Sequence, residues 1–484
     1  MISLHLKGIS TQWFILFIML ASIGIGVFLP FLLSGGNSYI ETRILYGSLA
    51  ILSIAFIFYE YMRYRWLGFV TPLTMTLAGF FYFFFFTPIF NPGIIPSLYL
   101  TPERYFPIVL VIGLGIFGFI VGYYFPNKFT PKFLNNWLNK SVSPRRLSQG
   151  VLMIVGIYIL IGLYMASIGN FSPIAFILQS RYTSLVNNVY EVQFQGSAYY
   201  LFQIFRWLPI AISSPGAYCL FDRRLSMQSR FLIVAGLSLM ILVALGQGVR
   251  YIFSFILGSI IIIIYIEYVQ QRIRGGLVRT RVFLLLVFML ISVLFQLQTR
   301  SAGGFYTILS GENSFDVYQS ISTFTSDIAA DQNYTLEGIL NADKFGILQY
   351  AKGESYLLNF VMFIPRQIWP GKPGEALAEK LRVANPFYID NVSYSVLGEL
   401  IFNFGRYSIF PGMLLGGILS RFWWNIFFIN KDSVQMVTLY AMSAVPLIFI
   451  VRGSFATMFG GIMYPMLLTI FLLEYSTWRR GASA

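Results

Sequence analysis

Apolar runs of about 20 residues recur along the whole chain, and they constrain its fold more than any other feature. A helix of that length crosses the hydrocarbon layer of a bilayer, which is about 30 Å thick. Hydrophobic residues make up 57% of the sequence and charged residues only 11%, far below the charge content of a soluble domain. The sequence therefore predicts an all-α polytopic integral membrane protein.

About twelve segments have the length and composition of a transmembrane helix. The first is too long for the core of a signal peptide and lacks an A-x-A cleavage site, so we expect it to be retained. The expected spans are 13–34, 44–62, 66–90, 106–124, 150–169, 198–220, 231–247, 250–269, 281–297, 406–428, 434–451 and 455–475.

Lys and Arg gather in alternate loops, and this asymmetry predicts the orientation, because basic loops stay in the cytoplasm. Arg63 and Arg65 fall in one such loop, and 127–146, 222–230 and 271–281 are others. The loops between them carry few charges. Both termini are therefore expected in the cytoplasm.

The longest polar stretch runs from Gln298 to about Ser393 and falls on the exterior side of the predicted topology. We expect one transmembrane domain, 1–484, with this loop (298–393) inserted between the ninth and tenth spans. A structureless loop of this length is uncommon, so part of it should fold. The segments 314–332 and 355–365 have the pattern of amphipathic or half-buried helices.

The composition excludes several functions. Cys219 is the single cysteine and His5 the single histidine, so a metal site built on these residues is not expected. The net charge of +14 comes mostly from the loops assigned to the cytoplasm, where it favours anionic lipid headgroups over nucleic acid. No Gly-rich phosphate-binding loop is present, which argues against ATP as a driving force, and we expect no cofactor.

Seven basic residues lie on, or just below, the exterior surface, where the positive-inside rule does not explain them. A charge inside the membrane costs about 2.5–3.5 kcal/mol on insertion scales and is a functional hypothesis by default. Arginine binds phosphate through a planar fork, so together these residues predict a pocket for an anionic lipid headgroup such as a pyrophosphate. Each of them alone is equally well explained by a helix-end side chain that reaches the headgroups or pairs with a carboxylate. The seven are Arg206, Arg250, Arg300, Arg366, Lys372, Arg406 and Arg452.

The segment "FIPRQIWPGKPGE" (363–375) predicts a stiff, non-helical loop, because its prolines fix φ and its glycines permit tight turns. Such a loop would hold Arg366 and Lys372 in place. Trp369 would offer an aromatic face to a sugar ring, as would Tyr251 near the start of the eighth span. Alternatively, the segment is a structural turn with an interfacial tryptophan, and aromatic belts place tyrosine at interfaces in any case.

Glu399, within "SVLGELIFNFG", is the best candidate for a general base, because the exterior face offers no histidine. Its alternative role is a salt bridge that braces the start of a helix. The chain has no D-x-D pair in this region, so a divalent metal that holds pyrophosphate is not predicted.

Three segments resemble one family. "KGESYLLNFVMFIPRQIWPGKP" (352–373) resembles the bacterial oligosaccharide repeat-unit polymerases of the O-antigen polymerase type, in which G-x-x-Y precedes an apolar helix and then P-R-x-x-W-P-x-K-P. "GELIFNFG" (398–405) and "GQGVRY" (246–251) are also similar to that family, as is one large exterior loop late in a many-span chain. The motifs cover about a tenth of the chain and the layout covers all of it.

The resemblance implies an enzyme of the bacterial inner membrane with its long loop in the periplasm. Such enzymes transfer a growing glycan from undecaprenyl pyrophosphate to a sugar hydroxyl of the next lipid-linked repeat, in a pathway for O-antigen or a related exopolysaccharide. A flippase and a chain-length regulator of that pathway are then expected partners. Independently of the family, clustered arginines stabilise the leaving pyrophosphate without a metal. We assign Arg250, Arg366 and Arg452 to the pyrophosphate with help from Lys372, and place Arg206, Arg300 and Arg406 second.

Three rivals stay open. An O-antigen ligase resembles this architecture and uses the same donor, but such ligases are expected to use an exterior histidine that this chain lacks. A flippase for the lipid-linked sugar should carry charges along a path through many spans and an internal repeat. A non-catalytic assembly subunit that binds only the lipid carrier is the third.

Overall fold

The computed structural model describes residues 38–90, 101–126, 136–138, 140–168, 197–222, 224–246, 250–270, 332–361, 364, 368–369, 394–453 and 455–477. Every regular element in these ranges is helical. Within these described ranges, seven helices are long and apolar enough to cross a membrane, which supports a multi-pass membrane protein. They are Ile40–Val70, Pro72–Phe90, Pro102–Tyr124, Pro144–Ile168, Met227–Gly246, Tyr251–Val269 and Arg406–Ile429.

The other expected spans have different outcomes. Residues 13–34 and 281–297 lie outside the described residues. The spans predicted at 198–220, 434–451 and 455–475 are helical but are not among the seven. The number twelve and the cytoplasmic termini therefore stay predictions.

The first half of the described chain begins with the long helix α3 (Ser38–Tyr64), which the 3-10 helix η2 (Arg65–Val70) follows. The predicted span 66–90 is not one regular helix. It consists of η2, α4 (Pro72–Phe80), the π-helical turn η3 (Phe81–Phe85) and α5 (Phe86–Phe90). Thr71 caps α4 by accepting a hydrogen bond from the Thr74 N–H, and Pro72 occupies the first helical position, which lacks a hydrogen-bond partner in any case.

Eight longer helices make up most of the remaining bundle. They are α7 (Pro102–Tyr124), α9 (Pro144–Ile168), α13 (Ser197–Phe221), α14 (Met227–Gly246), α15 (Arg250–Val269), α23 (Ile409–Ile429), α24 (Val434–Ala444) and α26 (Phe455–Thr477). Short elements connect or cover them: α19 (Gln332–Lys344), α20 (Glu354–Val361), α22 (Val396–Phe404), η5 (Arg406–Ser408) and α25 (Pro446–Phe449). The 298–393 stretch contains the helices α19 and α20, and α20 overlaps the segment predicted at 355–365.

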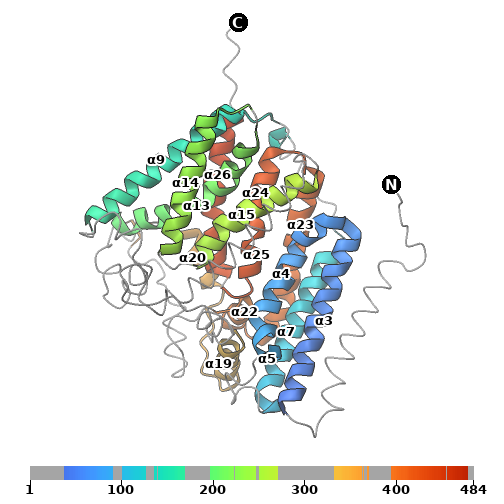
Figure 1. Cartoon of the computed structure of the whole chain (residues 1–484). Helices are drawn as coiled ribbons and strands as arrows, with labels where there is room; N and C mark the ends of the chain where they lie inside the picture. The colour runs from blue at the N-terminus through green and yellow to red at the C-terminus, as the bar shows by residue number, and fades with distance from the viewer. Residues whose placement is uncertain are drawn as a thin grey trace, which may run out of the picture.

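The buried side chains form two cores, and each is assembled from distant parts of the chain. One core unites α3, α4, η3 and α7 with α19, α22 and the first half of α23. The other unites α9, α13, α14 and α15 with α24, α26 and the last half of α23. Figure 1 shows the blue and cyan helices α3, α4 and α7 beside the orange helix α23. Thus α23 belongs to both cores.

Glycines allow α7 and α23 to pack with their backbones in contact. A Cβ at Gly122 would lie 2.0 Å from the Leu414 carbonyl oxygen, and a Cβ at Gly417 would lie 2.1 Å from that of Phe119. Such close approach through small residues is a common way for membrane helices to associate. It fixes the position of α23, whose N-terminal end adjoins α22.

Helices α19 and α22 lie at one end of the bundle, the lower end in Figure 1, which we call the α19–α22 end. The N-terminus of α26 is also at this end, because the backbone N–H of its first residue, Phe455, donates a hydrogen bond to Glu399 of α22. Of the residues that the sequence singled out as a candidate site, Glu399 and Arg406 lie at this end.

Candidate functional site

Glu399 is the most deeply placed of the candidate site residues, with no exposed surface. It lies in the first turn of α22, which Ser395 caps by accepting a 3.0 Å hydrogen bond from the Gly398 N–H. Its Oε1 accepts a 2.8 Å hydrogen bond from the Ser355 hydroxyl, and its Oε2 accepts one from the Phe455 N–H at the start of α26. The carboxylate thus joins α22, α20 and α26.

Asn403 extends this connection one turn further along α22. Its Nδ2 donates to the Ser355 Oγ at 2.7 Å and to the Glu399 carbonyl at 2.9 Å. Its Oδ1 accepts a 2.9 Å hydrogen bond from the Gly353 N–H. Gly353 has a φ of +91°, a conformation that favours glycine. The G-x-x-Y turn is therefore held against α22 by a buried and closed polar network.

Aromatic side chains cover the network. Tyr356 stacks on Phe404 with a centroid distance of 6.1 Å and meets the edge of Phe455 at 5.6 Å. Burial raises the pKa of Tyr356, and the charge of Glu399 raises it further, so the phenol stays neutral. Phe404 is 53% exposed, so this aromatic group reaches the surface.

Arg452 lies near the network, in the turn between α25 and α26, three residues before Phe455. Its guanidinium carbon is 5.7 Å from the centroid of the Phe83 ring in η3. A guanidinium over an aromatic face is attracted to the ring while it keeps its charge. Arg452 thus precedes the first turn of α26, to which Glu399 is bonded through the Phe455 N–H.

Arg406 follows α22 directly and is paired. Its Nε donates to Asp343 Oδ2 at 2.7 Å, and the Asp343 side chain is only 3% exposed, whereas that of Arg406 is 45% exposed. The Tyr350 hydroxyl donates to the other Asp343 oxygen at 2.5 Å. Asp343 thus connects the end of α19 to the turn that begins α23.

Arg206 lies apart from this group, on α13, with Tyr251 of α15. Its Nη2 donates a hydrogen bond to the Tyr251 hydroxyl, and its guanidinium carbon is 5.6 Å from the Tyr251 and Phe202 ring centroids. Both residues are half-buried. The sequence-based candidates Arg206 and Tyr251 are therefore neighbours, but Tyr251 is occupied by the arginine.

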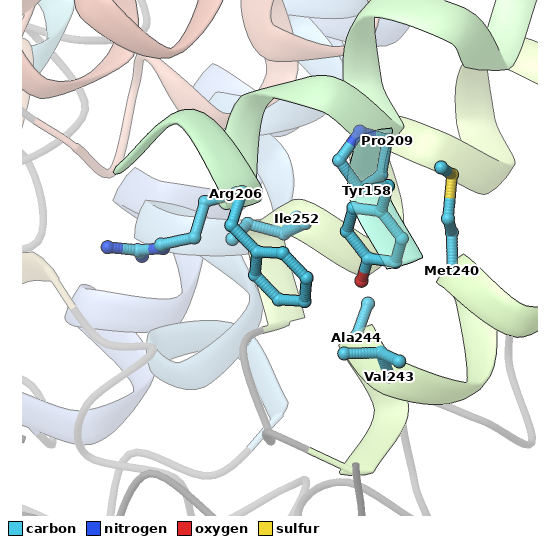
Figure 2. A pocket seen from close by; sticks show the side chains of 8 residues that line it. Tyr158, Arg206, Pro209, Met240, Val243, Ala244 and Ile252 are labelled. Carbon is cyan, nitrogen blue, oxygen red and sulfur yellow. The ribbon is translucent and has the colours of Figure 1, made fainter. Parts of the chain in front are cut away.

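A small hollow of about 10 Å³ adjoins Arg206 and is partly open to solvent. Figure 2 shows Tyr158 at its centre with Pro209, Met240, Val243, Ala244 and Ile252 around it, while the Arg206 side chain points away from the hollow. Phe205 stacks on Tyr158 with a centroid distance of 4.2 Å. The lining is mainly apolar, and a space of about one water molecule does not by itself indicate a ligand site.

A row of aromatic rings runs between Arg206 and Arg452. Successive centroids are 5.6 to 6.0 Å apart, which is normal for aromatic contacts. Arg206 covers the first ring and Arg452 the last. In order, the rings are Tyr251, Phe255, Phe449 and Phe83.

The remaining predicted residues are only partly described. Arg300, Arg366 and Lys372 lie outside the described residues, as does the segment 314–331. Arg250 begins α15, but its side chain is not described. Trp369 is 41% exposed. The predicted convergence of the seven basic residues therefore stays a prediction. Arg406 follows α22, the helix that carries Glu399, and Arg452 precedes α26, whose Phe455 N–H bonds to Glu399.

Helix α19 is attached to α3, η3 and α7 by polar contacts. Arg104 Nε lies 3.0 Å from Glu337 Oε1, and the Tyr46 hydroxyl donates to Asn333 Oδ1 at 3.0 Å. Asn333 Nδ2 donates to the Phe84 carbonyl at 2.8 Å. Since the π-helical turn changes the backbone hydrogen bonding of η3, this amide satisfies a carbonyl at the irregular place.

Sequence reasoning missed Ser355, Asn403 and Asp343. Ser355 and Asn403 fall inside the quoted motifs, which was a usable signal, whereas Asp343 has no local pattern. Within the described ranges, no group of three His, Cys, Asp or Glu side chains is arranged to hold a metal ion. The chemistry available at the α19–α22 end is therefore that of hydrogen-bonded carboxylates and arginines.

Comparison with protein-family models, with curated proteins and with solved structures finds no match for the chain.

Proposed function

We propose that this protein polymerises lipid-linked oligosaccharide repeat units at the exterior face of a bacterial inner membrane. One observation carries the proposal. The motif segments 352–361 and 398–405 are far apart in sequence, yet they pack as one unit through Ser355, Glu399 and Asn403. Arg452 lies beside this unit, so a cation and a carboxylate are held close together at one end of the bundle.

The proposed reaction is metal-independent glycosyl transfer. Departure of undecaprenyl pyrophosphate develops negative charge, which fixed arginines stabilise. Arg452 suits this role because its half-buried guanidinium lies on an aromatic face next to a helix N-terminus, where the backbone also favours an anion. Arg366, Lys372 and Arg250 would complete the pyrophosphate site, and Arg206 and Arg300 would support it.

Glu399 is the proposed general base, although its hydrogen bonds also suit a structural role. Both Glu399 oxygens accept protein hydrogen bonds, so this residue braces the site in the structure as it stands. For Glu399 to deprotonate an acceptor hydroxyl, substrate binding must displace the Ser355 hydroxyl or the Phe455 N–H. The tests below distinguish a base from a brace.

The experiment uses the purified full chain in nanodiscs with the lipid-linked repeat units of its host, and products are separated on a gel. Wild type should give a ladder that is insensitive to EDTA. Arg452→Ala should abolish the ladder and Arg452→Lys should restore only part of it, since lysine lacks the fork. Arg224→Ala is the matched control, because Arg224 pairs with Asp222 in a loop assigned to the cytoplasm.

Other outcomes would reject the proposal. A wild-type protein that makes no ladder from intact substrate is not a polymerase under these conditions. Transfer to a lipid A core or to a protein acceptor would identify a ligase. Movement of the labelled donor across the bilayer without any transfer would identify a flippase.

A further inference from the structure

We propose that Tyr350, Arg406 and Tyr407 form a saccharide-binding surface at the α19–α22 end, beside the Glu399 network. This inference rests on the proposed function and deepens it, because it assigns an acceptor site to residues that are separate from the pyrophosphate site. It gives Arg406 a different role from the one the sequence suggested.

The guanidinium of Arg406 is held in place by Asp343. Asp343 accepts from its Nε at 2.7 Å and is itself almost completely buried, so the guanidinium is held from one edge. Among the described residues, Asp343 is the group to which the Arg406 guanidinium donates. The Arg406 side chain is nevertheless 45% exposed. With Nε engaged by Asp343 and nearly half of the side chain exposed, we infer that the two terminal amino groups are available as a fixed fork of donors.

The positive charge of Arg406 is compensated by a carboxylate. Asp343 forms an ion pair with Arg406 and accepts from Tyr350 as well, so the pair carries no net charge. A phosphate gains most from an uncompensated cation, whereas a neutral polyol gains from directed donors. The compensated fork is therefore better suited to neighbouring sugar hydroxyls than to a pyrophosphate.

Two exposed tyrosines, Tyr350 and Tyr407, accompany the Arg406 guanidinium. The Tyr350 ring lies 3.3 to 3.6 Å from the position of a Cβ on Gly405, whose φ is +78°, so only glycine fits there without strain. Tyr350 is 47% exposed and Tyr407 is 90% exposed. Exposed aromatic faces next to polar donors suit a sugar, which presents C–H groups on one face and hydroxyls at its edge.

Tyr350 and Arg406 are ordered before any ligand binds. The Tyr350 hydroxyl and Arg406 Nε bind the two oxygens of one buried carboxylate, so the ring and the fork are fixed relative to each other. The hydrogen bond to Asp343 raises the pKa of Tyr350 and keeps its phenol neutral. A surface that is ordered before binding loses less entropy on binding.

The test measures binding without catalysis. The probe is the oligosaccharide released from the host's lipid-linked repeat unit by mild acid, titrated into the full chain in nanodiscs and followed by saturation-transfer NMR. Arg406→Ala and Tyr407→Ala should each weaken binding by roughly tenfold, as expected for truncated anchor residues. Arg406→Lys should weaken binding almost as much, because it keeps the charge and loses the fork.

Tyr475→Ala is the matched control and should bind as wild type does. Tyr475 is similarly exposed, at 48%, and lies twenty residues beyond Phe455 on α26, about 30 Å along the helix. Thermal unfolding of each variant shows that a loss of binding is not a loss of fold.

A second measurement tests whether Tyr407 lies among lipid headgroups instead of facing water. Tyr407→Cys should react with a water-soluble maleimide, with wild type as the background because Cys219 is buried. Protection from this reagent together with labelling by a membrane-soluble maleimide would make Tyr407 a lipid anchor and overturn the inference.

The remaining outcomes separate this inference from the proposed function. Unchanged oligosaccharide binding in Arg406→Ala and Tyr407→Ala, with a normal wild-type ladder, overturns the saccharide surface and leaves the polymerase. Binding that both substitutions abolish, with no wild-type ladder, supports the surface and rejects the polymerase.

Discussion

The carboxylate of Glu399 accepts a hydrogen bond from the backbone N–H of Phe455, which lies 56 residues later in the chain. Glu399 lies on α22 within the core that contains α3 and α7, and Phe455 begins α26 of the other core. A carboxylate at a helix N-terminus satisfies an otherwise unpaired N–H and interacts favourably with the helix dipole. This contact fixes the two cores relative to each other next to Arg452.

Glu399→Gln and Glu399→Ala should separate the two roles of this residue. Glutamine keeps the shape and one acceptor, so it should lower stability less than alanine, which leaves the buried Ser355 hydroxyl and Phe455 N–H without their acceptor at a cost of about 1–3 kcal/mol each. If Glu399 is the base, Glu399→Gln loses activity while its melting temperature stays close to that of wild type. A loss of activity that follows the melting temperature in both variants identifies a brace. Asn403→Ala provides the comparison for a purely structural change.

The packing of α7 on α23 should be intolerant of a single methyl group at two positions. Gly122→Ala and Gly417→Ala each drive a Cβ into a backbone carbonyl, so we expect a loss of at least 1–3 kcal/mol or no folded protein. Gly113→Ala and Gly416→Ala are matched controls on the same two helices, with nearest atoms at 3.9 and 3.8 Å. Thermal unfolding in detergent checks this, and equal behaviour of all four variants would contradict it.

The pH dependence of stability should contain a term from Glu337. Burial raises the pKa of this carboxyl above its ordinary value of 4.5, although Arg104 and Asn341 oppose the shift. Between pH 4.5 and the raised pKa, the folded protein therefore binds more protons at this group than the unfolded chain does. The unfolding free energy from this group falls as the pH rises through that window.

Glu337→Gln should remove that term. The difference in melting temperature between variant and wild type should move in favour of the variant as the pH rises from 4.5, and then level off above the raised pKa. Loss of the ion pair adds little because Arg104 is 46% exposed. A difference that is constant with pH would show that Glu337 titrates normally in the folded protein.

Asn333→Ala should loosen α19. The substitution leaves the Tyr46 hydroxyl and the Phe84 carbonyl without their partner, at a cost of about 1–3 kcal/mol for each buried group. Hydrogen exchange followed by mass spectrometry should show faster exchange in 332–344, with α9 as the internal reference. Asn341→Ala removes an exposed side chain that bonds to Glu337 within the same helix, so it should raise the exchange far less than Asn333→Ala does. Equal exchange in both variants would contradict the assigned role of Asn333.

Local patterns in the sequence predicted much of the helical architecture. Runs of about 20 apolar residues located seven candidate spans that the structure contains, and the 355–365 pattern located α20. The break of 66–90 into η2, α4, η3 and α5 was missed. Thr71–Pro72 was a usable local signal for a new helix start, whereas the π-helical turn lies in a run of aromatic residues with no local signal. Contacts such as that of Asn333 with the Phe84 carbonyl fix the irregular turn, and these depend on tertiary structure.

The candidate site was predictable as a list of residues but not as a set of contacts. The pairing of Arg206 with Tyr251 and the burial of Glu399 both depend on how distant helices pack. One signal was present and unused. Glu60 is an acidic residue at the end of an apolar run, and the structure shows it fully buried with the Tyr123 and Tyr124 hydroxyls at 3.2 and 2.8 Å.

The interleaving of the two cores sets the order in which the protein can be completed during synthesis. Residues 45–123 supply the first part of one core, but their partners at 394–413 leave the ribosome almost 300 residues later. The first helices must therefore wait in the bilayer with incomplete interfaces. Helix α23 supplies side chains to both cores, and the second core is complete only after α24 and α26 have followed. A ribosome that stalls before α23 would leave two unfinished halves, each a substrate for membrane quality control.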